Sequence, residues 1–334
     1  MIHFVAAQVH SLIEDIRLLE TFVTAPLGLY SDIKMLREAL PLPEAADLSP
    51  AETQERRTAF RMHTKDASGL TLGTIGHLSK SMDALEALSP DTIAPISHEW
   101  VKRARMVLSR AEEKVGADLR AATAAKVRGL YVIVGPDATN GRPVADVATA
   151  ALRGGARVLQ LRDKAGDKGQ VLATAKKLKA LCNEHEALFI MNDDVDLAAL
   201  SDAHGLHVGQ GDLPVQGARR LLILRQLVGR SNNTLEEALQ SQADGADYIA
   251  IGAVFPTQTM GKAQRKTVGV ETIRKAKDVL SPPVVAIGGI NASNIAEVAR
   301  AGADCVCVVS AVTTARDPEA AARQLVTAIE SAKK

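Results

Sequence analysis

Hydrophobic residues follow two different rhythms along the chain, and the change comes near residue 126. Before it, apolar positions recur every three or four residues, as in residues 5–23 and 100–119, which places one apolar stripe on a helix. No run in this part alternates apolar and polar residues as a half-buried strand would. The pattern therefore predicts a small all-α domain of four or five helices over residues 1–126.

After residue 126, short apolar runs alternate with helical segments. The runs occupy residues 130–134, 158–161, 188–191, 206–208, 227–228, 248–251, 284–287 and 305–309, of which the fifth is weak. Several intervening segments end in glycine and a small residue, as at Gly245-Ala246, which suits the left-handed turn after a helix. Eight such units in about 200 residues predict a (β/α)8 TIM barrel over residues 127–334. A doubly wound open sheet is the structural alternative.

Composition narrows the class of protein. The 334 residues suffice for two domains, and 46% apolar residues suffice for their cores. A formal net charge of +1 gives no reason to expect nucleic acid or an anionic membrane as a partner. Three cysteines are too few for a disulfide framework, and the N-terminus lacks the basic segment of a signal peptide. We therefore expect a cytoplasmic protein without a membrane span.

Polar residues collect where the apolar runs end, which is where (β/α)8 barrels carry their active sites. Gln160, Arg162 and Lys164 follow the second run, and alternate residues of a strand share one face. A guanidinium forks onto phosphate oxygens and an ammonium adds a point charge. We interpret this stretch as a phosphate-binding wall, and a solvated strand end is the alternative.

Carboxylates follow the next two runs. Asn192 and Asp193 come after the third run, and Asp212 comes shortly after the fourth. Mg2+ prefers oxygen ligands and typically takes one or two carboxylates together with substrate phosphates. Asp193 and Asp212 could therefore bridge Mg2+ to a diphosphate, or they could be ordinary turn aspartates.

Two further features have structural interpretations. Thr234 and Glu237, which follow the fifth run, form the pattern of a capping box, so Ser231 is the better functional candidate there. His204 and His207 lie three residues apart at the entry to a strand, and we expect turn and barrel roles for them rather than metal ligation.

The last three runs end in residues suited to a second phosphate. Thr257 and Thr259 follow the sixth run, Gly289 follows the seventh, and Val309 with Ser310 closes the eighth. Glycine lets backbone N–H groups approach an anion, and the loops after strands seven and eight are the usual phosphate site of this fold. The residues alone thus predict one barrel mouth that binds two phosphorylated small molecules.

Taken together, these stretches resemble thiamine-phosphate synthase. The matching pieces are residues 160–164, 192–194, 207–212, 255–259, 287–290 and 309–310. The resemblance implies a transferase that joins hydroxymethylpyrimidine diphosphate to thiazole phosphate by a dissociative mechanism and releases diphosphate. It implies catalytic roles for Arg162, Lys164 and Ser231, and the catalytic role that we expect for Lys262 is a separate hypothesis, given below.

The resemblance also assigns the site residue by residue. It implies that the pyrimidine diphosphate is held by Gln160, Arg162, Lys164, Asn192 and Ser231. It implies that the thiazole phosphate is held by Thr257, Thr259, Gly289, Val309 and Ser310. It implies that Mg2+ is bound by Asp193 and Asp212.

One position departs from the family pattern Thr-x-Thr-Lys. Here Met260 follows Thr259, and Lys262 lies two residues further on in a loop that also holds Arg265 and Lys266. Our hypothesis is that Lys262 supplies the missing charge. The alternative is that this loop is simply basic and solvated.

Other functions remain open at this point. A thiazole tautomerase shares this barrel, but its relatives commonly carry a histidine where Asn233 stands, and it has less need of the carboxylates. A phosphate-sensing or scaffold protein without catalysis would explain Met260. The helical part bears a faint likeness to the hydroxymethylpyrimidine-phosphate kinase domain at residues 18–20, 36–38, 61–66 and 73–74. It contains no nucleotide phosphate loop, and a packing or homodimerisation domain is the alternative.

Overall fold

The computed structural model describes residues 2–22, 28–40, 51, 54–55, 67–87, 96–257 and 266–333. It divides into two compact units, Met1–Leu119 and Arg120–Lys334. The boundary falls inside helix α5 (His98–Ala124), so the last turn of that helix belongs to the second unit. Residues 61–66 lie outside the described residues, and so do Thr259, Met260 and Lys262.

The first unit is all-α in its described part, as predicted. Its helices are α1 (Ile2–Phe22), α2 (Tyr30–Glu38), α4 (Ala67–Glu86) and the greater part of α5. They share a hydrophobic core of their own, to which the predicted stripes contribute Leu12, Ile16 and Trp100. The Trp100 indole Nε1–H donates to the backbone oxygen of Leu36 at 2.9 Å, which ties α5 to α2.

The second unit is a closed barrel of eight parallel strands in the order β1 to β8, so the open-sheet alternative is wrong. The strands are β1 (Gly129–Val134), β2 (Val158–Leu161), β3 (Leu188–Asn192), β4 (Gly205–Val208), β5 (Leu227–Asn232), β6 (Tyr248–Ile251), β7 (Val284–Ile287) and β8 (Cys305–Val308). β5 has six residues, whereas the apolar run predicted only two. The prediction was too short because the second half of the strand is polar. β8 ends one residue early, and Val309 is the N-cap of a short helix.

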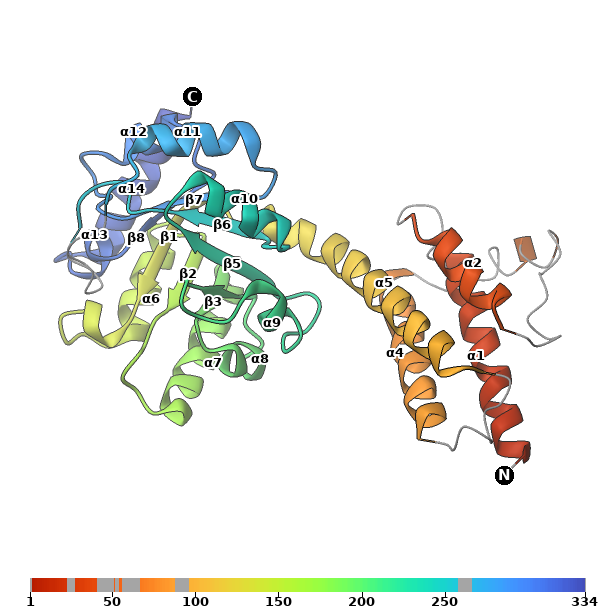
Figure 1. Ribbon diagram of the computed structural model, residues 1–334. Helices are drawn as coiled ribbons and strands as arrows, with labels where there is room; N and C mark the ends of the chain where they lie inside the picture. The colour runs from red at the N-terminus through yellow and green to blue at the C-terminus, as the bar shows by residue number, and fades with distance from the viewer. Residues whose placement is uncertain are drawn as a thin grey trace. The chain divides into compact units, whose positions relative to one another are not determined.

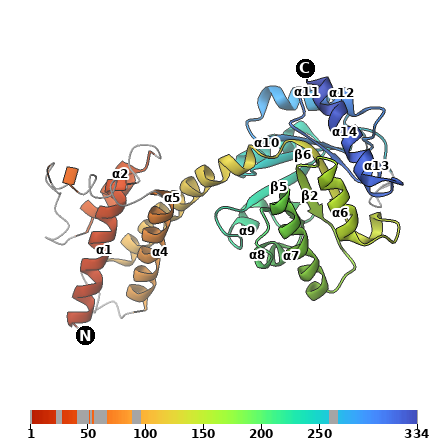
Figure 2. The same ribbon diagram turned by 180° about the vertical axis from the view of Figure 1, so that it is seen from behind.

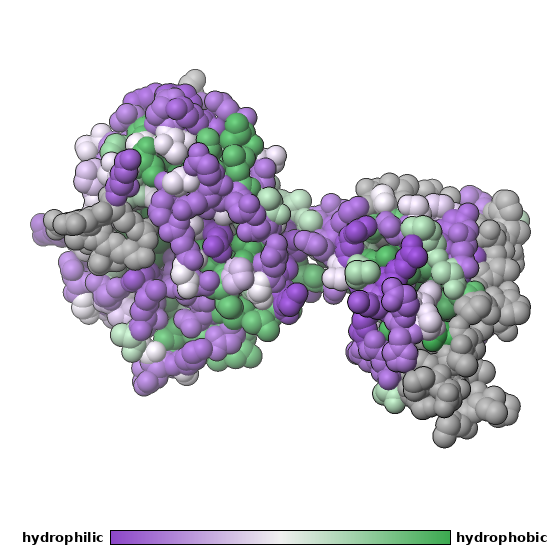
Figure 3. All heavy atoms as spheres, in the orientation of Figure 1, coloured by the Kyte–Doolittle hydropathy of each residue, from purple (hydrophilic) through white to green (hydrophobic). Residues whose placement is uncertain are grey.

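Helices surround the strands, as Figures 1 and 2 show from two sides. They are α6 (Val144–Arg153), α7 (Lys168–Glu184), α8 (Val195–Leu200), α9 (Val215–Arg219), α10 (Leu235–Ala243), α11 (Val270–Val279), α12 (Ile295–Arg300), α13 (Ser310–Thr313) and α14 (Pro318–Ala332). A short 3-10 helix, η2 (Pro136–Ala138), follows β1. Figure 3 shows hydrophilic side chains over most of the visible barrel face, with hydrophobic ones in small groups. No helix among the described residues has the length and apolar character to cross a membrane.

Strand side chains alternate between two hydrophobic layers. One face of each strand packs against the surrounding helices, and the other face fills the barrel interior. The interior cluster includes Tyr131, Ile133 and Tyr248, and it also takes in Ala124 and Val127 from the segment before β1. This segment therefore closes the amino-terminal end of the barrel, and the opposite end is left for a site.

Two partly buried carboxylates brace the amino-terminal end of the barrel. Asp247 lies just before β6, and its side chain accepts from Arg120 Nε at 2.8 Å, from an Arg219 guanidinium nitrogen at 2.6 Å and from the Val228 N–H at 2.7 Å. Asp304 plays the equivalent part before β8. Each aspartate thus ties the start of one strand to the backbone of a neighbouring strand.

We predict that Asp247→Asn destabilises the barrel. The change leaves the Arg120 and Arg219 side chains, only 4% and 15% exposed, without their counter-charge. Breaking a buried pair in this way costs about 3 kcal/mol of unfolding free energy, which urea denaturation followed by circular dichroism would measure. Glu319→Gln is the control, because its exposed pair with Arg323 is worth less than about 1 kcal/mol. Equal losses in the two variants would contradict this account.

Candidate active site

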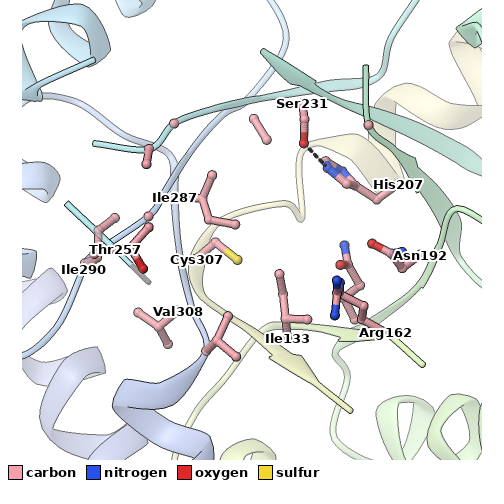
Figure 4. A pocket seen from close by; sticks show the side chains of 18 of the residues that line it. Ile133, Arg162, Asn192, His207, Ser231, Thr257, Ile287, Ile290, Cys307 and Val308 are labelled. Carbon is pink, nitrogen blue, oxygen red and sulfur yellow. Dashed lines mark hydrogen bonds between the residues drawn. The ribbon is translucent and has the colours of Figure 1, made fainter. Parts of the chain in front are cut away.

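A cavity of about 690 Å3 opens at the carboxyl ends of the strands. All eight strands, or the loops that follow them, contribute residues to its lining. Every described residue that the sequence nominated for the site lines this one cavity: Gln160, Arg162, Lys164, Asn192, Asp193, Asp212, Ser231, Thr257, Gly289, Val309 and Ser310. Figure 4 shows several of these side chains pointing into it.

The cations of the cavity are paired with carboxylates. The Arg162 guanidinium lies 2.9 Å from an Asp137 oxygen, and Lys164 Nζ lies 2.8 Å from an Asp193 oxygen. Asp137 belongs to the 3-10 helix after β1, and the sequence patterns gave no sign of it. An incoming phosphate would compete with these carboxylates for the two cations.

The two candidate metal ligands lie in the same cavity. Asp193 sits at the end of β3 with φ of +59°, a left-handed conformation that is uncommon outside glycine and recurs at functional sites. An Asp212 oxygen accepts from the Gly209 N–H at 2.8 Å, which holds the β4 loop. The described residues contain no group of three or more His, Cys, Asp or Glu side chains suited to a metal ion. Two carboxylates are nevertheless the usual protein share of a Mg2+ site whose other ligands are phosphate oxygens.

The opposite wall comes from the loops after β6, β7 and β8. Gly289 has φ of +67°, and a Cβ atom there would lie 2.6 Å from the Pro256 backbone oxygen. Only glycine therefore allows the β6 and β7 loops to touch at this point. The hydroxyls of Thr257 and Ser310 line the cavity beside it. This wall offers hydroxyls and closely packed backbone to an anion.

A line of hydrogen-bonded polar groups crosses the barrel interior beneath the cavity. His207 lies between Ser231 Oγ, 2.8 Å from its Nε2, and the Tyr248 hydroxyl, 3.0 Å from its Nδ1, and Figure 4 shows the first contact. The Tyr248 hydroxyl lies 3.4 Å from that of Tyr131, which accepts from Gln160 Nε2 at 2.7 Å. His207 reaches the cavity surface, but its ring lies deep in the barrel, and burial lowers its pKa to about 4 despite the Asp212 carboxylate. The ring is therefore neutral at pH 7.

Sequence patterns placed His207 in a barrel role but missed its contact with Ser231. The spacing along β4 could have indicated that His207 points inward. His207 stands two residues after Gly205, so the two residues lie on the same face of the strand. His204, by contrast, points away from the cavity lining, and its Nδ1 accepts from the Phe189 N–H at 2.9 Å.

Apolar side chains separate the two polar walls. In Figure 4, Ile133, Ile287 and Cys307 lie between the wall that carries Arg162 and the wall that carries Thr257. Burial raises the pKa of the Cys307 thiol well above its usual value, which disfavours the thiolate that a nucleophilic cysteine requires. The cavity thus suits ligands with an apolar ring and an anionic end.

The loop after β5 is fixed by its predicted cap. Thr234 Oγ1 accepts from the Glu237 N–H at 3.2 Å, as a capping residue does. The Glu237 carboxylate accepts from the Asn233 N–H at 2.7 Å and also from the Gln210 side chain. The capping pair therefore ties the β5 loop to the β4 loop at the rim of the cavity.

A closed eight-stranded parallel barrel with a polar cavity at its carboxyl end is the scaffold of the (β/α)8 enzymes, which carry their active sites there. Residues 130–312 match the family model of thiamine monophosphate synthase. The chain belongs to this family, and it is an enzyme of the thiamine-phosphate synthase class, a transferase of thiamine biosynthesis.

Individual relatives support the same conclusion. The thiamine-phosphate synthase of Shouchella clausii is 42% identical over 203 residues, which cover 61% of this chain and 97% of the relative. That of Thioalkalivibrio sulfidiphilus is 46% identical over 209 residues, 62% of this chain and 98% of the relative. The structure of thiamine phosphate pyrophosphorylase from Pyrococcus furiosus aligns with a TM-score of 0.58 at 36% identity, and covers 63% of this chain and 98% of that one.

Proposed function

We propose that the barrel joins hydroxymethylpyrimidine diphosphate to 4-methyl-5-hydroxyethylthiazole phosphate. The carbon–oxygen bond to diphosphate breaks first, and diphosphate leaves with the electron pair. The thiazole nitrogen then forms the new carbon–nitrogen bond to the pyrimidine cation, which yields thiamine phosphate. The observation that carries this proposal is the cavity itself, in which an apolar floor separates a cationic wall from a hydroxyl-rich wall.

The cationic wall is the proposed seat of the diphosphate. Its residues are Gln160, Arg162, Lys164, Asn192 and Ser231. In a dissociative reaction the protein accelerates the step by stabilising the anion that leaves, with donors placed in advance. Arg162, Lys164 and Ser231 are the proposed catalytic residues, and no side chain needs to act as a nucleophile.

The opposite wall is the proposed seat of the thiazole phosphate. Thr257, Gly289, Val309 and Ser310 line it, and Thr259 would join them from the segment that follows. The loops after β7 and β8 are the customary phosphate site of this fold, which supports the assignment.

We assign Mg2+ binding to Asp193 and Asp212. Both carboxylates line the cavity, and Asp193 already forms an ion pair with Lys164 of the cationic wall. When bound, Mg2+ would neutralise charge on the diphosphate and so make it a better leaving group. The protein's own part is to hold two carboxylates and two cations around one anion.

The first prediction of this proposal is a requirement for both substrates. Diphosphate release and thiamine phosphate formation, followed together, should fall to background when either substrate is omitted. Turnover of the thiazole phosphate alone would instead indicate a tautomerase, and binding without turnover would indicate a sensing or scaffold protein.

In the same assay Lys262→Ala should lower kcat/KM about 100-fold. Unchanged turnover and affinity would show that Lys262 does not replace the lysine expected at Met260.

A second prediction concerns the metal and needs no turnover. Calorimetric titration with inorganic diphosphate should show tighter binding when Mg2+ is present. Asp193→Asn and Asp212→Asn should each reduce that enhancement by at least about tenfold. Asp146→Asn, which changes an exposed carboxylate on α6 outside the cavity, is the matched control. An enhancement that survives in both Asp193→Asn and Asp212→Asn would refute the assignment.

For the helical unit, residues 1–126 in the predicted division, we propose association between two copies of the chain. Tyr30, Met35 and Met106 are 47%, 44% and 62% exposed, and Arg103 on α5 contacts the Met35 sulfur of α2 at 3.9 Å. Sedimentation equilibrium should show a dimer that Met106→Lys shifts toward monomer. A wild-type chain that stays monomeric up to high concentration would rule this role out.

We also propose a cytoplasmic location. The cysteines Cys182, Cys305 and Cys307 are all free and buried, as expected in a reducing compartment. Recovery of the native protein in an exported fraction of the cell would contradict this location.

A further inference from the structure

Five polar groups form a continuous hydrogen-bonded line across the barrel interior, which we call the interior chain. It consists of Gln160, Tyr131, Tyr248, His207 and Ser231, which come from β2, β1, β6, β4 and β5. The four successive contacts measure 2.7, 3.4, 3.0 and 2.8 Å. Only the two ends, Gln160 and Ser231, and the His207 ring line the cavity.

The interior chain has a direction, because each hydroxyl carries one proton. Gln160 Nε2 donates to the Tyr131 oxygen, so the Tyr131 proton is directed to Tyr248. The Tyr248 proton is then directed to His207 Nδ1. If the Gln160 amide kept this orientation and Tyr248 donated to Tyr131, the Tyr131 oxygen would receive two hydrogen bonds. The buried proton of Tyr131 would then have neither Gln160 nor Tyr248 as its acceptor. An unsatisfied buried donor is costly, and Tyr131 is 2% exposed.

The direction determines the tautomer of His207. A ring nitrogen that accepts a hydrogen bond carries no proton, so a histidine ring that accepts at Nδ1 is neutral and has its one proton on Nε2. Because Nδ1 accepts from Tyr248, the proton lies on Nε2 and is donated to Ser231 Oγ, 2.8 Å away. The Ser231 hydroxyl proton is then free to point into the cavity.

Close packing fixes where the Tyr248 ring lies. Tyr248 is paired in register with Gly229 of the adjacent strand, and a Cβ atom at Gly229 would lie 1.9 Å from the Tyr248 Cζ atom. The missing side chain is what lets the Tyr248 ring lie across the interior. The ring also stacks on His207, with centroids 5.7 Å apart and planes inclined by 23°. Tyr248 therefore holds both the position and the tautomer of His207.

We propose that the interior chain commits Ser231 to donate a hydrogen bond to the diphosphate leaving group, with Tyr248 and His207 as positioning residues. The inference rests on the proposed placement of diphosphate at Ser231. At the other end, the same direction leaves the Gln160 carbonyl oxygen as an acceptor toward the cavity. The two ends thus match a ligand that donates at Gln160, as an aminopyrimidine N–H can, and accepts at Ser231, as a phosphate does. Turning the Gln160 amide round would reverse both ends together.

The tautomer can be measured directly in the full chain labelled with 15N-histidine. Ring nitrogen shifts distinguish protonated from unprotonated nitrogens, and loss of signals in His207→Gln identifies those of His207. We expect Nδ1 unprotonated and Nε2 protonated in the wild type. Tyr131→Phe, which removes a hydroxyl one step further away, should keep this tautomer, and Tyr248→Phe should shift it toward the other. A wild-type ring protonated on Nδ1 overturns the inference, whether or not Tyr248→Phe folds.

The consequence for binding is tested with inorganic diphosphate by calorimetry. Ser231→Ala should weaken binding about tenfold, and Tyr248→Phe should weaken it by a similar factor in the wild-type background. In the Ser231→Ala background, Tyr248→Phe should have less than about a twofold effect, because the two act through one hydroxyl. Equal effects in both backgrounds overturn the inference.

The two measurements distinguish this inference from the proposed function. An unchanged affinity in Ser231→Ala removes diphosphate from Ser231 and overturns the inference together with that assignment. An Nδ1-protonated His207 overturns the inference alone, since two-substrate turnover and Mg2+-dependent binding do not depend on it.

Discussion

The filling of a closed barrel is the constraint on which the rest of this structure depends. Eight parallel strands enclose a space that side chains must occupy without leaving voids. Here two tyrosines, Tyr131 and Tyr248, fill much of it, and Gly229 gives the Tyr248 ring its room. Large rings bring hydroxyls into an apolar interior, and buried hydroxyls require partners. The barrel satisfies them with groups that also reach the cavity, so the packing of the core prescribes the polarity of the site.

The two ends of the barrel divide stability from chemistry. At the amino-terminal end, Asp247 and Asp304 each bind a cation and the backbone of a neighbouring strand, and the segment with Ala124 and Val127 closes the interior. These charges are paired with one another and with strand backbone rather than directed into a cavity. At the carboxyl end the charges face an open cavity instead. The same residue types therefore serve different purposes according to the end of the strand at which they stand.

The sequence predicted the features that leave a pattern along the chain, and it missed those that depend on contacts between distant side chains. The barrel and most strand bounds could be predicted, because strands buried on both faces read as short apolar runs. β5 was underestimated because Ser231 and Asn232 are polar, although Ser231 lines the cavity and Asn232 accepts from Ser241 of the neighbouring helix α10. Site residues at strand ends could be nominated, since topology alone brings the ends together. Asp137 and the partner of His207 could not, because they depend on side-chain contacts between strands that sequence spacing does not record.

The charges of the cavity show how such a site stays stable before its ligands arrive. Lys164 holds Asp193, and Arg162 holds Asp137, whose side chain is 63% exposed. Both cations among the described residues of the cavity lining therefore have a counter-charge, which offsets the cost of gathering them in one place. On the proposed assignment, diphosphate and Mg2+ together offer each group a new partner of opposite sign. Lys164 can turn to phosphate as Asp193 turns to the metal, so neither is left unpaired. Binding is then an exchange of partners, which explains why the wall carries carboxylates and cations in nearly equal number.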